Sequence, residues 1–553
     1  MQQLIECVPN FSEGQDMAVI ETLKVEIEAV EGVRVLNIDP GKATNRTVVT
    51  FVGNPPAVVE AAYRAIKKAG ELIDMSKHKG EHPRMGATDV CPLVPIANIT
   101  MGETVEWAQR LAERVGRELS LPVYLYEEAQ PDKTRSNLSV IRAGEYEGFF
   151  EKISEFKPDF GPATMDVKRG ATVIGARDFL VAYNVNLNTT SVRRANAIAF
   201  DVREAGRKIK VKVEDEVEIE KVVPGSLKHV KAIGWYIEEY GIAQISINLT
   251  NINITPVHIA FDEVCRKADA RGIRVTGSEL VGLIPLKAML DAGKYFLKKQ
   301  KRSVGVSEKE LIRMAVKSLG LSELYPFKPE EKIIEYMLQD KSENRLVSMP
   351  LSDFADETAS ETPAPGGGSI AAYVGSLGIS LGTMVANLSS HKKGWDDRWE
   401  EFSNWAEKGQ AYKDELLRLV DADTKAFNGI IQAMGLPKGT EEEQAARKKA
   451  ISEATKFAIE IPFRVMQTSY ESMEVIKAMV ETGNPNSVTD AGVGALCARS
   501  AVMGAFMNVR INAANYDDKV LVHDVVTRGK EIEAKAKAKE EEILEIVNAK
   551  IGL

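Results

Sequence analysis

Cysteine is scarce in this chain, which contains only four among its 553 residues. Cys7, Cys91, Cys265 and Cys497 lie far apart and form no CxxC pair. This distribution argues against a disulfide framework and against a cysteine-based zinc site, and it is typical of a reducing compartment.

Long apolar runs and an excess of positive charge are also missing. No window reaches the roughly 18 to 20 apolar residues of a membrane helix. The start, MQQLIECVPNFSEG, lacks the basic region and the apolar length of a signal peptide. We therefore expect a cytoplasmic protein with no membrane partner. The net charge of −9 argues against nucleic acid as a partner, so an anionic ligand needs a local basic cluster.

Strand-like and helix-like patterns alternate through the first part of the chain. RTVVTFVGN has the period-two pattern of a strand, and TVEWAQRLAERVGREL has the spacing of an amphipathic helix. A second alternating unit begins near Phe179 without a linker-like composition, so we expect the two units to pack closely. The sequence predicts two α/β subdomains, over residues 1–179 and 180–325.

Only helical patterns follow this α/β region. A short linker over residues 326–333, which begins with PFKPEEK, leads into long helical patterns that continue to Leu553. Small residues in two of these helices permit close helix packing, which a helix bundle or a dimer interface would use. The sequence predicts an all-α, bundle-like domain over residues 334–553.

Two of the six histidines lie in one charged segment that includes KGEHPRMGATDV. His82 precedes Pro83, which biases its backbone toward an extended conformation. A loop histidine is suited to moving a proton, and a simple surface position is the alternative. Arg84 lies near enough in the sequence to bind a carboxylate beside His82. His78 lies four residues before His82, but the intervening Gly80 argues against the helix that a metal pair would need.

A carboxylate interrupts an apolar helical stripe in the segment LVDADTKAF. Asp423 lies within the stripe, whereas Asp421 lies about 200° round the helix from it. A carboxyl group on an apolar face often has a raised pKa and acts as a general acid or base. A structural Asp bonded to a neighbouring helix end is the alternative. The stripe is formed by Leu416, Val420, Phe427, Ile430 and Met434.

Two glycine-rich segments have structural and functional interpretations that the sequence does not separate. PAPGGGS, residues 363–369, precedes a helical pattern, where exposed N–H groups can bind an anion. It lacks both the P-loop and the dinucleotide-binding patterns, so a flexible hinge is equally compatible. GPATMDVKRGATVIGARDF, residues 161–179, is either a hairpin or a loop whose glycines allow backbone contact with an anionic ligand.

Taken in their order along the chain, these segments resemble the bifunctional formimidoyltransferase–cyclodeaminase family of histidine breakdown. The resemblance covers essentially the whole chain. It implies that the first two subdomains transfer a formimino group from N-formimino-L-glutamate to N5 of tetrahydrofolate. The helical domain then closes the product to 5,10-methenyltetrahydrofolate and releases ammonia. The segments that carry the resemblance are ECVPNFSEG, TNRTVVTFVG, DMSKHKGEHPRMGATDVCP, IRAGEYEG, DFGPATMDVKRGATVIGAR, PEEKIIEYML, PAPGGGSIAA and LVDADTKAF.

The resemblance also implies site residues and partners. His82 matches the catalytic histidine of the transferase, and Asp423 matches the proton-transfer Asp of the cyclodeaminase. Tetrahydrofolate, with one or more glutamates in its tail, is the implied co-substrate, and no metal is implied. The helical domains are expected to pair as dimers within a larger ring-like homo-oligomer. The folate-binding segment matches Gly161, Pro162, Ala163, Thr164, Met165, Asp166, Val167, Lys168, Arg169 and Gly170.

The chemistry of formimino transfer agrees with this assignment. A base must take the N5 proton and the departing glutamate nitrogen must gain one, and a single histidine can serve both steps.

Two alternative functions remain. The helical domain with its PGGGS motif also resembles methenyltetrahydrofolate cyclohydrolases, from which ammonia release would distinguish it. A non-catalytic folate-binding protein is the other alternative. Asp423 argues against it, because an apolar residue would pack better at that position of the apolar helical stripe.

Overall fold

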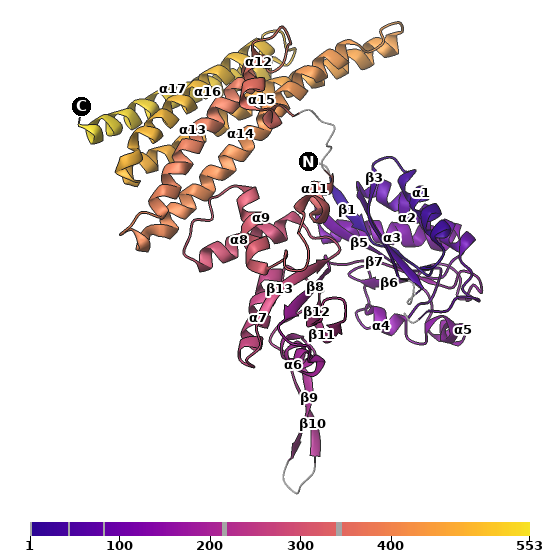
Figure 1. Cartoon of the computed structure of the whole chain (residues 1–553). Helices are drawn as coiled ribbons and strands as arrows, with labels where there is room; N and C mark the ends of the chain where they lie inside the picture. Colours follow the sequence, from indigo (N-terminus) through magenta and orange to yellow (C-terminus); the bar gives the residue numbers. More distant parts are fainter. Residues whose placement is uncertain (1–2, 42–44, 81–82, 213–217, 339–344, 553) are drawn as a thin grey trace. The chain divides into compact units, whose positions relative to one another are not determined.

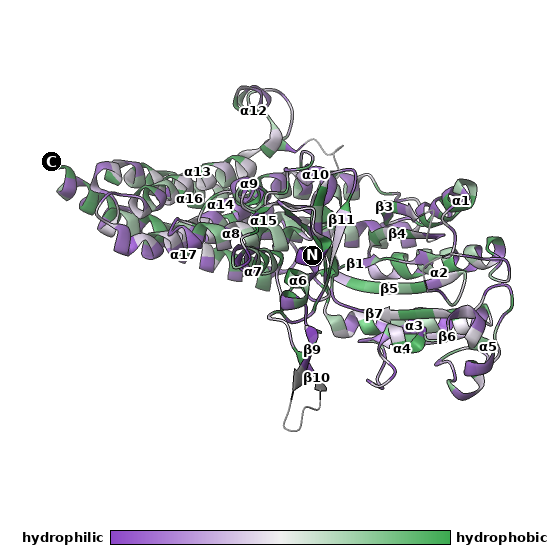
Figure 2. Cartoon of the chain, turned by 60° about the horizontal axis from the view of Figure 1, so that its bottom comes forward, coloured by the Kyte–Doolittle hydropathy of each residue, from purple (hydrophilic) through white to green (hydrophobic). Residues whose placement is uncertain are grey.

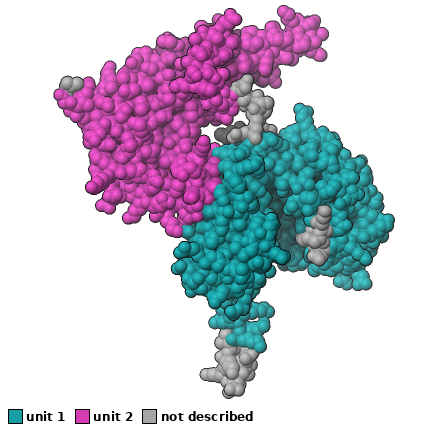
Figure 3. Space-filling view, viewed as in Figure 1, with its two compact units in different colours: residues 1–289, 319–339 teal, residues 290–318, 340–553 magenta. Residues whose placement is uncertain are grey.

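The computed structural model describes residues 3–41, 45–80, 83–212, 218–338 and 345–552. The chain divides into two compact units (Figure 3). Unit 1 comprises residues 1–289 and 319–339, and unit 2 comprises residues 290–318 and 340–553. Strands and helices mix in unit 1, and the described part of unit 2 contains helices without strands. The predicted succession of α/β and all-α folds is therefore confirmed.

A seven-stranded mixed sheet forms the first half of unit 1 (Figure 1). Its order is β3, β4, β1 together with β2, β5, β7 and β6, and only the β5–β7 and β7–β6 pairs are parallel. Figure 2 shows β5 and β7 as largely hydrophobic, as expected for parallel strands covered on both faces. The strands are β1 (Leu4–Cys7), β2 (Asn10–Phe11), β3 (Val33–Gly41), β4 (Arg46–Gly53), β5 (Thr88–Ala97), β6 (Val123–Glu127) and β7 (Thr172–Ala176).

Helices cover both faces of this sheet. α2 and α3 pack on one face over a core that includes Phe51 and Leu93, and α5 covers part of the other face through Phe149, which contacts Tyr124. This arrangement leaves the loops at the ends of the strands to form a site. The helices are α1 (Met17–Glu28), α2 (Pro55–Leu72), α3 (Met101–Glu118), α4 (Leu138–Ile141) and α5 (Glu145–Glu155).

A four-stranded antiparallel sheet in the order β11, β12, β8, β13 forms the second half of unit 1. Ala243, Ile245 and Ile247 alternate along β12 and are buried, and α6 and α7 pack on this sheet. β9 and β10 form a separate hairpin. The strands are β8 (Val181–Leu187), β9 (Arg207–Lys212), β10 (Glu218–Val223), β11 (Val230–Ile237), β12 (Ile242–Leu249) and β13 (Val275–Val281). The helices that follow β8 and continue to residue 338 are α6 (Val192–Val202), α7 (Val257–Asp269), α8 (Leu286–Lys299), α9 (Glu308–Leu319), α10 (Pro329–Lys332) and α11 (Ile334–Leu338).

Long helices pack closely in unit 2, where α13 contacts α14, α15 and α16. Glycine permits this approach, because a Cβ added at Gly378 would lie 2.8 Å from the Gly494 carbonyl oxygen of α16. The core therefore depends on small residues as well as on large apolar ones. The helices are α12 (Leu351–Thr358), α13 (Gly367–Ser390), α14 (Trp399–Met434), α15 (Glu441–Thr482), α16 (Val488–Ala513) and α17 (Lys519–Ile551).

Two helical segments of unit 2, α13 and residues 485–513, are long and apolar enough to cross a membrane by length and composition alone. The sequence analysis did not expect this. Within unit 2, 61% of the most apolar 18-residue stretch of α13 is buried, and 50% of the corresponding stretch of residues 485–513 is buried. Burial of this extent is also found in the core helices of large helical proteins.

Residues 290–318 belong to unit 2, although the α/β pattern of the sequence continues through them. Within unit 2 the Val304 N–H donates to Ser403 Oγ at 3.0 Å. The Gly305 carbonyl oxygen accepts from Asn387 Nδ2 at 2.8 Å and from Gln410 Nε2 at 3.1 Å. A cut at the predicted linker would therefore separate this segment from its hydrogen-bond partners.

We expect a fragment that ends at residue 339, where unit 1 ends, to fold as unit 1 while residues 290–318 lose protection, because their partners in α13 and α14 are removed. Hydrogen–deuterium exchange, measured by mass spectrometry on the fragment and on the full chain, tests this expectation. Equal protection of residues 290–318 in both proteins would show that the segment folds with unit 1.

Glu6 is a buried carboxyl group on β1, with only 3% of the residue exposed. Burial raises its pKa from 4.5 to about 7, and the positive charge of Arg177 opposes this shift only in part. Between these values the folded chain binds more protons than the unfolded chain. The destabilising effect of Glu6 therefore grows as the pH rises and is complete above about pH 7.

Glu6→Gln is expected to raise the free energy of unfolding of unit 1 by about 2–3 kcal/mol at pH 8 and by less than about 1 kcal/mol at pH 5. The neutral amide removes the cost of a buried charge at the higher pH, where the carboxyl group is ionised. Urea unfolding of both proteins at both pH values measures the difference. An equal gain at the two pH values would exclude ionisation of Glu6 as the cause.

Candidate functional sites

The loop after α2 and the segment 161–170 meet at one end of the first sheet. The Met75 N–H donates to the Lys168 carbonyl oxygen at 2.8 Å, and the Ala87 N–H donates to the Arg169 carbonyl oxygen at 2.8 Å. Two segments that the sequence analysis singled out separately therefore form one surface beside the start of β5.

The close approach of these two segments requires glycine at position 170. Gly170 has a φ of +75°, and a Cβ added there would lie 2.3 Å from the Met85 carbonyl oxygen. Lys168 Nζ donates to the Glu71 carbonyl oxygen, and Arg169 forms an ion pair of 2.6 Å with Asp166. Arg169 Nη1 also donates to the Leu119 carbonyl oxygen at 2.8 Å, so both cations of the segment bind groups of the chain itself. Its exposed residues are Gly161, Ala163, Thr164, Val167 and Lys168.

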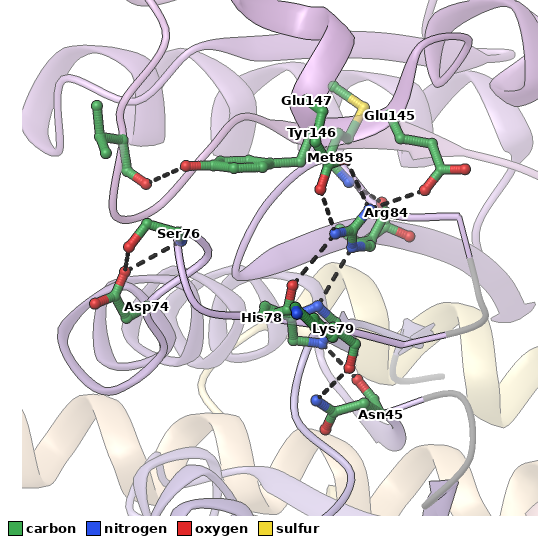
Figure 4. A network of polar contacts seen from close by, with 12 residues as sticks. Asn45, Asp74, Ser76, His78, Lys79, Arg84, Met85, Glu145, Tyr146 and Glu147 are labelled. Atoms are coloured by element: carbon green, nitrogen blue, oxygen red, sulfur yellow. Dashed lines mark hydrogen bonds and ion pairs between the residues drawn. The ribbon is translucent and has the colours of Figure 1, made fainter.

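Arg84 lies at the centre of a polar network in this loop (Figure 4). Its guanidinium group binds the Glu147 carboxylate through two hydrogen bonds of 2.7 and 2.9 Å and the Glu145 carboxylate at 2.9 Å. Paired N–H donors of this kind match a carboxylate well. Arg84 therefore binds carboxylates of the chain itself and fixes the loop to α5.

His78 completes this network. Arg84 Nε donates to His78 Nδ1 at 3.3 Å, and His78 Nε2 lies 2.9 Å from the Asn45 carbonyl oxygen. Because Nδ1 accepts, Nε2 carries the hydrogen and donates it to that carbonyl oxygen. Both ring nitrogens are used in holding the loop. His82, the predicted catalytic residue, lies outside the described residues.

In unit 2, Asp423 lies against the first turn of α13. Ser369 Oγ donates to Asp423 Oδ2 at 3.0 Å, and the Ser369 backbone N–H also bonds the carboxylate. A Cβ added at Gly368 would lie 2.2 Å from Asp423 Oδ1. The PGGGS motif therefore brings a helix start into direct contact with the predicted catalytic carboxyl group, a placement that only glycine at position 368 permits.

Burial raises the pKa of Asp423, and the two hydrogen bonds from Ser369 oppose this rise only in part. The predicted apolar stripe accounts for some of this burial, because Val420 is fully buried. Phe427 and Met434, however, are 39% and 52% exposed. The carboxyl group is therefore covered by the first turn of α13, and less by the Phe427 side chain of the predicted stripe.

Asp421, on another face of α14, has a different environment. Its carboxylate accepts from the Leu346 N–H at 2.8 Å and from Arg345 Nε at 3.2 Å. It therefore anchors the segment that precedes α12. The two aspartates of the DAD motif are separated as the helical spacing predicts, and only Asp423 meets the glycine-rich motif.

Sequence reasoning missed two polar residues at the Asp423 site. Thr424 Oγ1 lies 3.2 Å from Ser369 Oγ, and Asn508 of α16 lies beside Gly367, where an added Cβ would be 3.3 Å from Asn508 Nδ2. Their proximity arises from helix packing, which periodicity within one helix does not report. Among the described residues, no group of three or more His, Cys, Asp or Glu side chains is arranged to hold a metal ion.

Three protein families match successive parts of the chain. Residues 4–177 match the N-terminal subdomain of the formiminotransferase domain, and residues 182–339 match the formiminotransferase domain. Residues 350–531 match the formiminotransferase-cyclodeaminase family. Together the matches extend over both compact units.

Curated relatives match the whole chain and each half. A formimidoyltransferase-cyclodeaminase of Gallus gallus is 45% identical over 96% of this chain and 96% of its own length. A glutamate formimidoyltransferase of Streptococcus pyogenes is 42% identical over 54% of this chain and 94% of its own length. A methenyltetrahydrofolate cyclohydrolase of Methylorubrum extorquens is 34% identical over 36% of this chain and 97% of its own length.

Proposed function

The chain belongs to the formimidoyltransferase–cyclodeaminase family of bifunctional folate enzymes, and from this premise we propose a site for each of its two reactions. Formimino transfer from N-formimino-L-glutamate to tetrahydrofolate takes place in unit 1, at the loop that follows α2 and at the segment 161–170. Ring closure to 5,10-methenyltetrahydrofolate, with release of ammonia, takes place at Asp423 of unit 2. The observation that carries the second assignment is the contact of Asp423 with the first turn of α13.

His82 is the proposed base of the transfer reaction. It takes the N5 proton as the amine attacks the formimino carbon and returns a proton to the departing glutamate nitrogen. The network of Arg84 with His78, Glu145 and Glu147 supports this proposal, because it holds the chain on the C-terminal side of His82 in a fixed position.

Asp423 is the proposed proton-transfer group of ring closure. N10 must lose a proton as it attacks the formimino carbon, and the departing nitrogen must gain one to leave as ammonia. A carboxyl group with an ordinary pKa of about 3.9 is too acidic for both steps. The raised pKa of Asp423 supports its role, since the group then holds a proton more readily than an ordinary carboxyl group does.

Folate binding is assigned to residues 161–170 in unit 1. The exposed backbone and side chains around Thr164 and Val167, directly beside the loop, support this assignment. Tetrahydrofolate with several tail glutamates is proposed as a co-substrate in addition to the form with one. Comparison of KM values for the two forms tests this point, and a much weaker interaction of the longer form would contradict it.

A homo-oligomer built from dimers of the helical domain is also part of the proposal, in a cytoplasmic protein. Exposed apolar side chains on α13 and α16 support it, since a second copy would remove them from water. Analytical ultracentrifugation measures the assembly, and a monomer at micromolar concentration would contradict it. The exposed residues are Leu377 (46%), Leu388 (46%), Val493 (50%), Met507 (58%) and Ile511 (71%).

The decisive experiment supplies the purified chain with N-formimino-L-glutamate and tetrahydrofolate. Methenyltetrahydrofolate is followed by its absorbance, and ammonia is measured in the same sample. Equal amounts of the two products support both activities. If supplied formimino-tetrahydrofolate gives no ammonia while methenyltetrahydrofolate is hydrolysed, unit 2 is a cyclohydrolase, as in the Methylorubrum extorquens relative. Binding of tetrahydrofolate without any turnover would indicate a folate-binding protein.

A further inference from the structure

The hydroxyl group of Ser369 has more hydrogen-bond partners than it can serve at one time. Its Oγ lies 3.0 Å from Asp423 Oδ2 and 3.0 Å from the Val420 carbonyl oxygen. It also lies 3.2 Å from Thr424 Oγ1. A serine hydroxyl has one hydrogen to donate and two lone pairs with which to accept. The carboxylate of Asp423 and the carbonyl group of Val420 therefore compete, at equal distance, for a single hydrogen.

The position of this hydroxyl group is fixed by the packing of two helices. Ser369 lies in the first turn of α13, and its partners Val420, Asp423 and Thr424 lie on one turn of α14. Ser369 and Val420 are fully buried, so bulk water cannot replace a partner that is lost. A carbonyl oxygen has two lone pairs, and that of Val420 can accept within α14 and still accept from Ser369.

This arrangement fits both protonation states of Asp423 without any movement of the helices. When the carboxyl group is ionised, the Ser369 hydroxyl donates to Oδ2, and Thr424 can donate to the Ser369 oxygen. When Asp423 carries a proton, the Ser369 hydrogen can turn to the Val420 carbonyl oxygen, and the Ser369 oxygen can accept from the acid. Only the rotation of one O–H bond separates the two arrangements.

We propose that Ser369 is the positioning residue of Asp423, and that its hydroxyl group donates to the carboxylate before N10 gives up its proton and turns to the Val420 carbonyl oxygen while Asp423 holds that proton. This inference rests on the ring closure proposed above for unit 2. In that reaction the bond between N10 and the formimino carbon forms, and the bond from that carbon to the departing nitrogen breaks. The proton taken from N10 leaves with ammonia. Asp423 therefore ends the reaction ionised, as it began.

The proton affinity of Asp423 depends on Ser369 and not on a neighbouring charge. Its pKa is raised by burial and lowered by the two hydrogen bonds from Ser369, and no charged side chain of the described residues shifts it appreciably. Ser369 is thus the group of the chain that favours the ionised form. The charged residues nearby on the helices that pack here are Asp421 and Lys425 of α14, Lys456 and Glu460 of α15, and Arg510 of α16.

The pH profile of ammonia release from formimino-tetrahydrofolate tests the proposal in Ser369→Ala. Ring closure requires ionised Asp423, so the rate falls as the pH drops through the pKa of this group. Loss of a hydrogen bond to a charged group favours the protonated form, and the acid limb of the profile is expected to move to higher pH by about one pH unit. A lower rate at every pH with an unmoved acid limb would assign Ser369 a purely structural role and overturn the proposal.

Two further variants make the test specific. Ser376→Ala is the matched control, because Ser376 is also buried on α13 but its hydroxyl donates to the Tyr373 carbonyl oxygen of the same helix at 2.7 Å. Its acid limb should not move. Ser369→Cys keeps nearly the same size with a weaker donor, and a smaller shift in the same direction is expected. If the alanine variant fails to fold, Ser369→Cys carries the test, and an unmoved acid limb again overturns the proposal.

Infrared spectroscopy measures the same proton without substrate. The C=O band of the protonated Asp423 carboxyl group is identified as the band that Asp423→Asn removes. Its titration midpoint is expected at higher pH in Ser369→Ala than in the unchanged chain. A raised midpoint in a chain that releases no ammonia would support the role of Ser369 and refute the ring closure proposed for unit 2. An unmoved midpoint beside normal ammonia release would refute the role of Ser369 alone.

Discussion

Replacing Asp423 with Asn is expected to abolish ammonia release from formimino-tetrahydrofolate while formimino transfer continues. The amide has nearly the same shape as the carboxyl group and still accepts the hydrogen bonds from Ser369, so unit 2 should remain folded. Near neutral pH the amide can neither take a proton from N10 nor give one to the departing nitrogen. Ammonia measured after addition of formimino-tetrahydrofolate reports ring closure directly, and transfer is assayed separately with the two substrates.

Asp421→Asn is the matched control for this experiment, because it changes the same group two residues away in the same helix. Its oxygen would still accept from the Leu346 N–H, and the weakened ion pair with Arg345 is a partly exposed one that contributes little. Ammonia release should therefore remain close to that of the unchanged chain. Loss of ammonia release in the Asp421 variant and its persistence in the Asp423 variant would refute the assignment.

Local patterns in the sequence were sufficient to predict much of the fold. The segment TVEWAQRLAERVGREL forms α3, whose N-terminus has a capping box made by Thr100 and Glu103. The hairpin of β9 and β10 was not predicted, although Ile209 and Val211 alternate with lysines and give the period-two signal of a strand. Elements whose own residues show a periodic pattern can thus be predicted from the sequence.

The environment of the candidate sites depended on contacts between distant segments, which periodicity does not report. Helical spacing separated Asp423 from Asp421, but it placed Phe427 beside Asp423, where the structure has the first turn of α13. In the same way, the sequence placed Arg84 near His82 but could not show that Glu145 and Glu147 occupy its guanidinium group. Residue type predicted the chemistry, and tertiary packing determined which groups remain available for it.

His82→Ala is expected to reduce formimino transfer by a factor of about 10² to 10⁴, the range typical of a lost general base. Ring closure of supplied formimino-tetrahydrofolate should be unaffected, because the group proposed for that step, Asp423, lies in unit 2. The transfer rate is measured with N-formimino-L-glutamate and tetrahydrofolate at saturating concentrations, so that a weaker affinity is not mistaken for slower chemistry.

His78→Gln is the matched control, because glutamine retains an acceptor for Arg84 Nε and a donor for the Asn45 carbonyl oxygen but has no ring to titrate. If His82 is the base, this variant should keep most of the transfer activity. If transfer survives in His82→Ala and is lost in His78→Gln, the base is His78, and the hydrogen bonds of its two ring nitrogens must open during turnover. The two variants together therefore decide which histidine of the loop moves the proton.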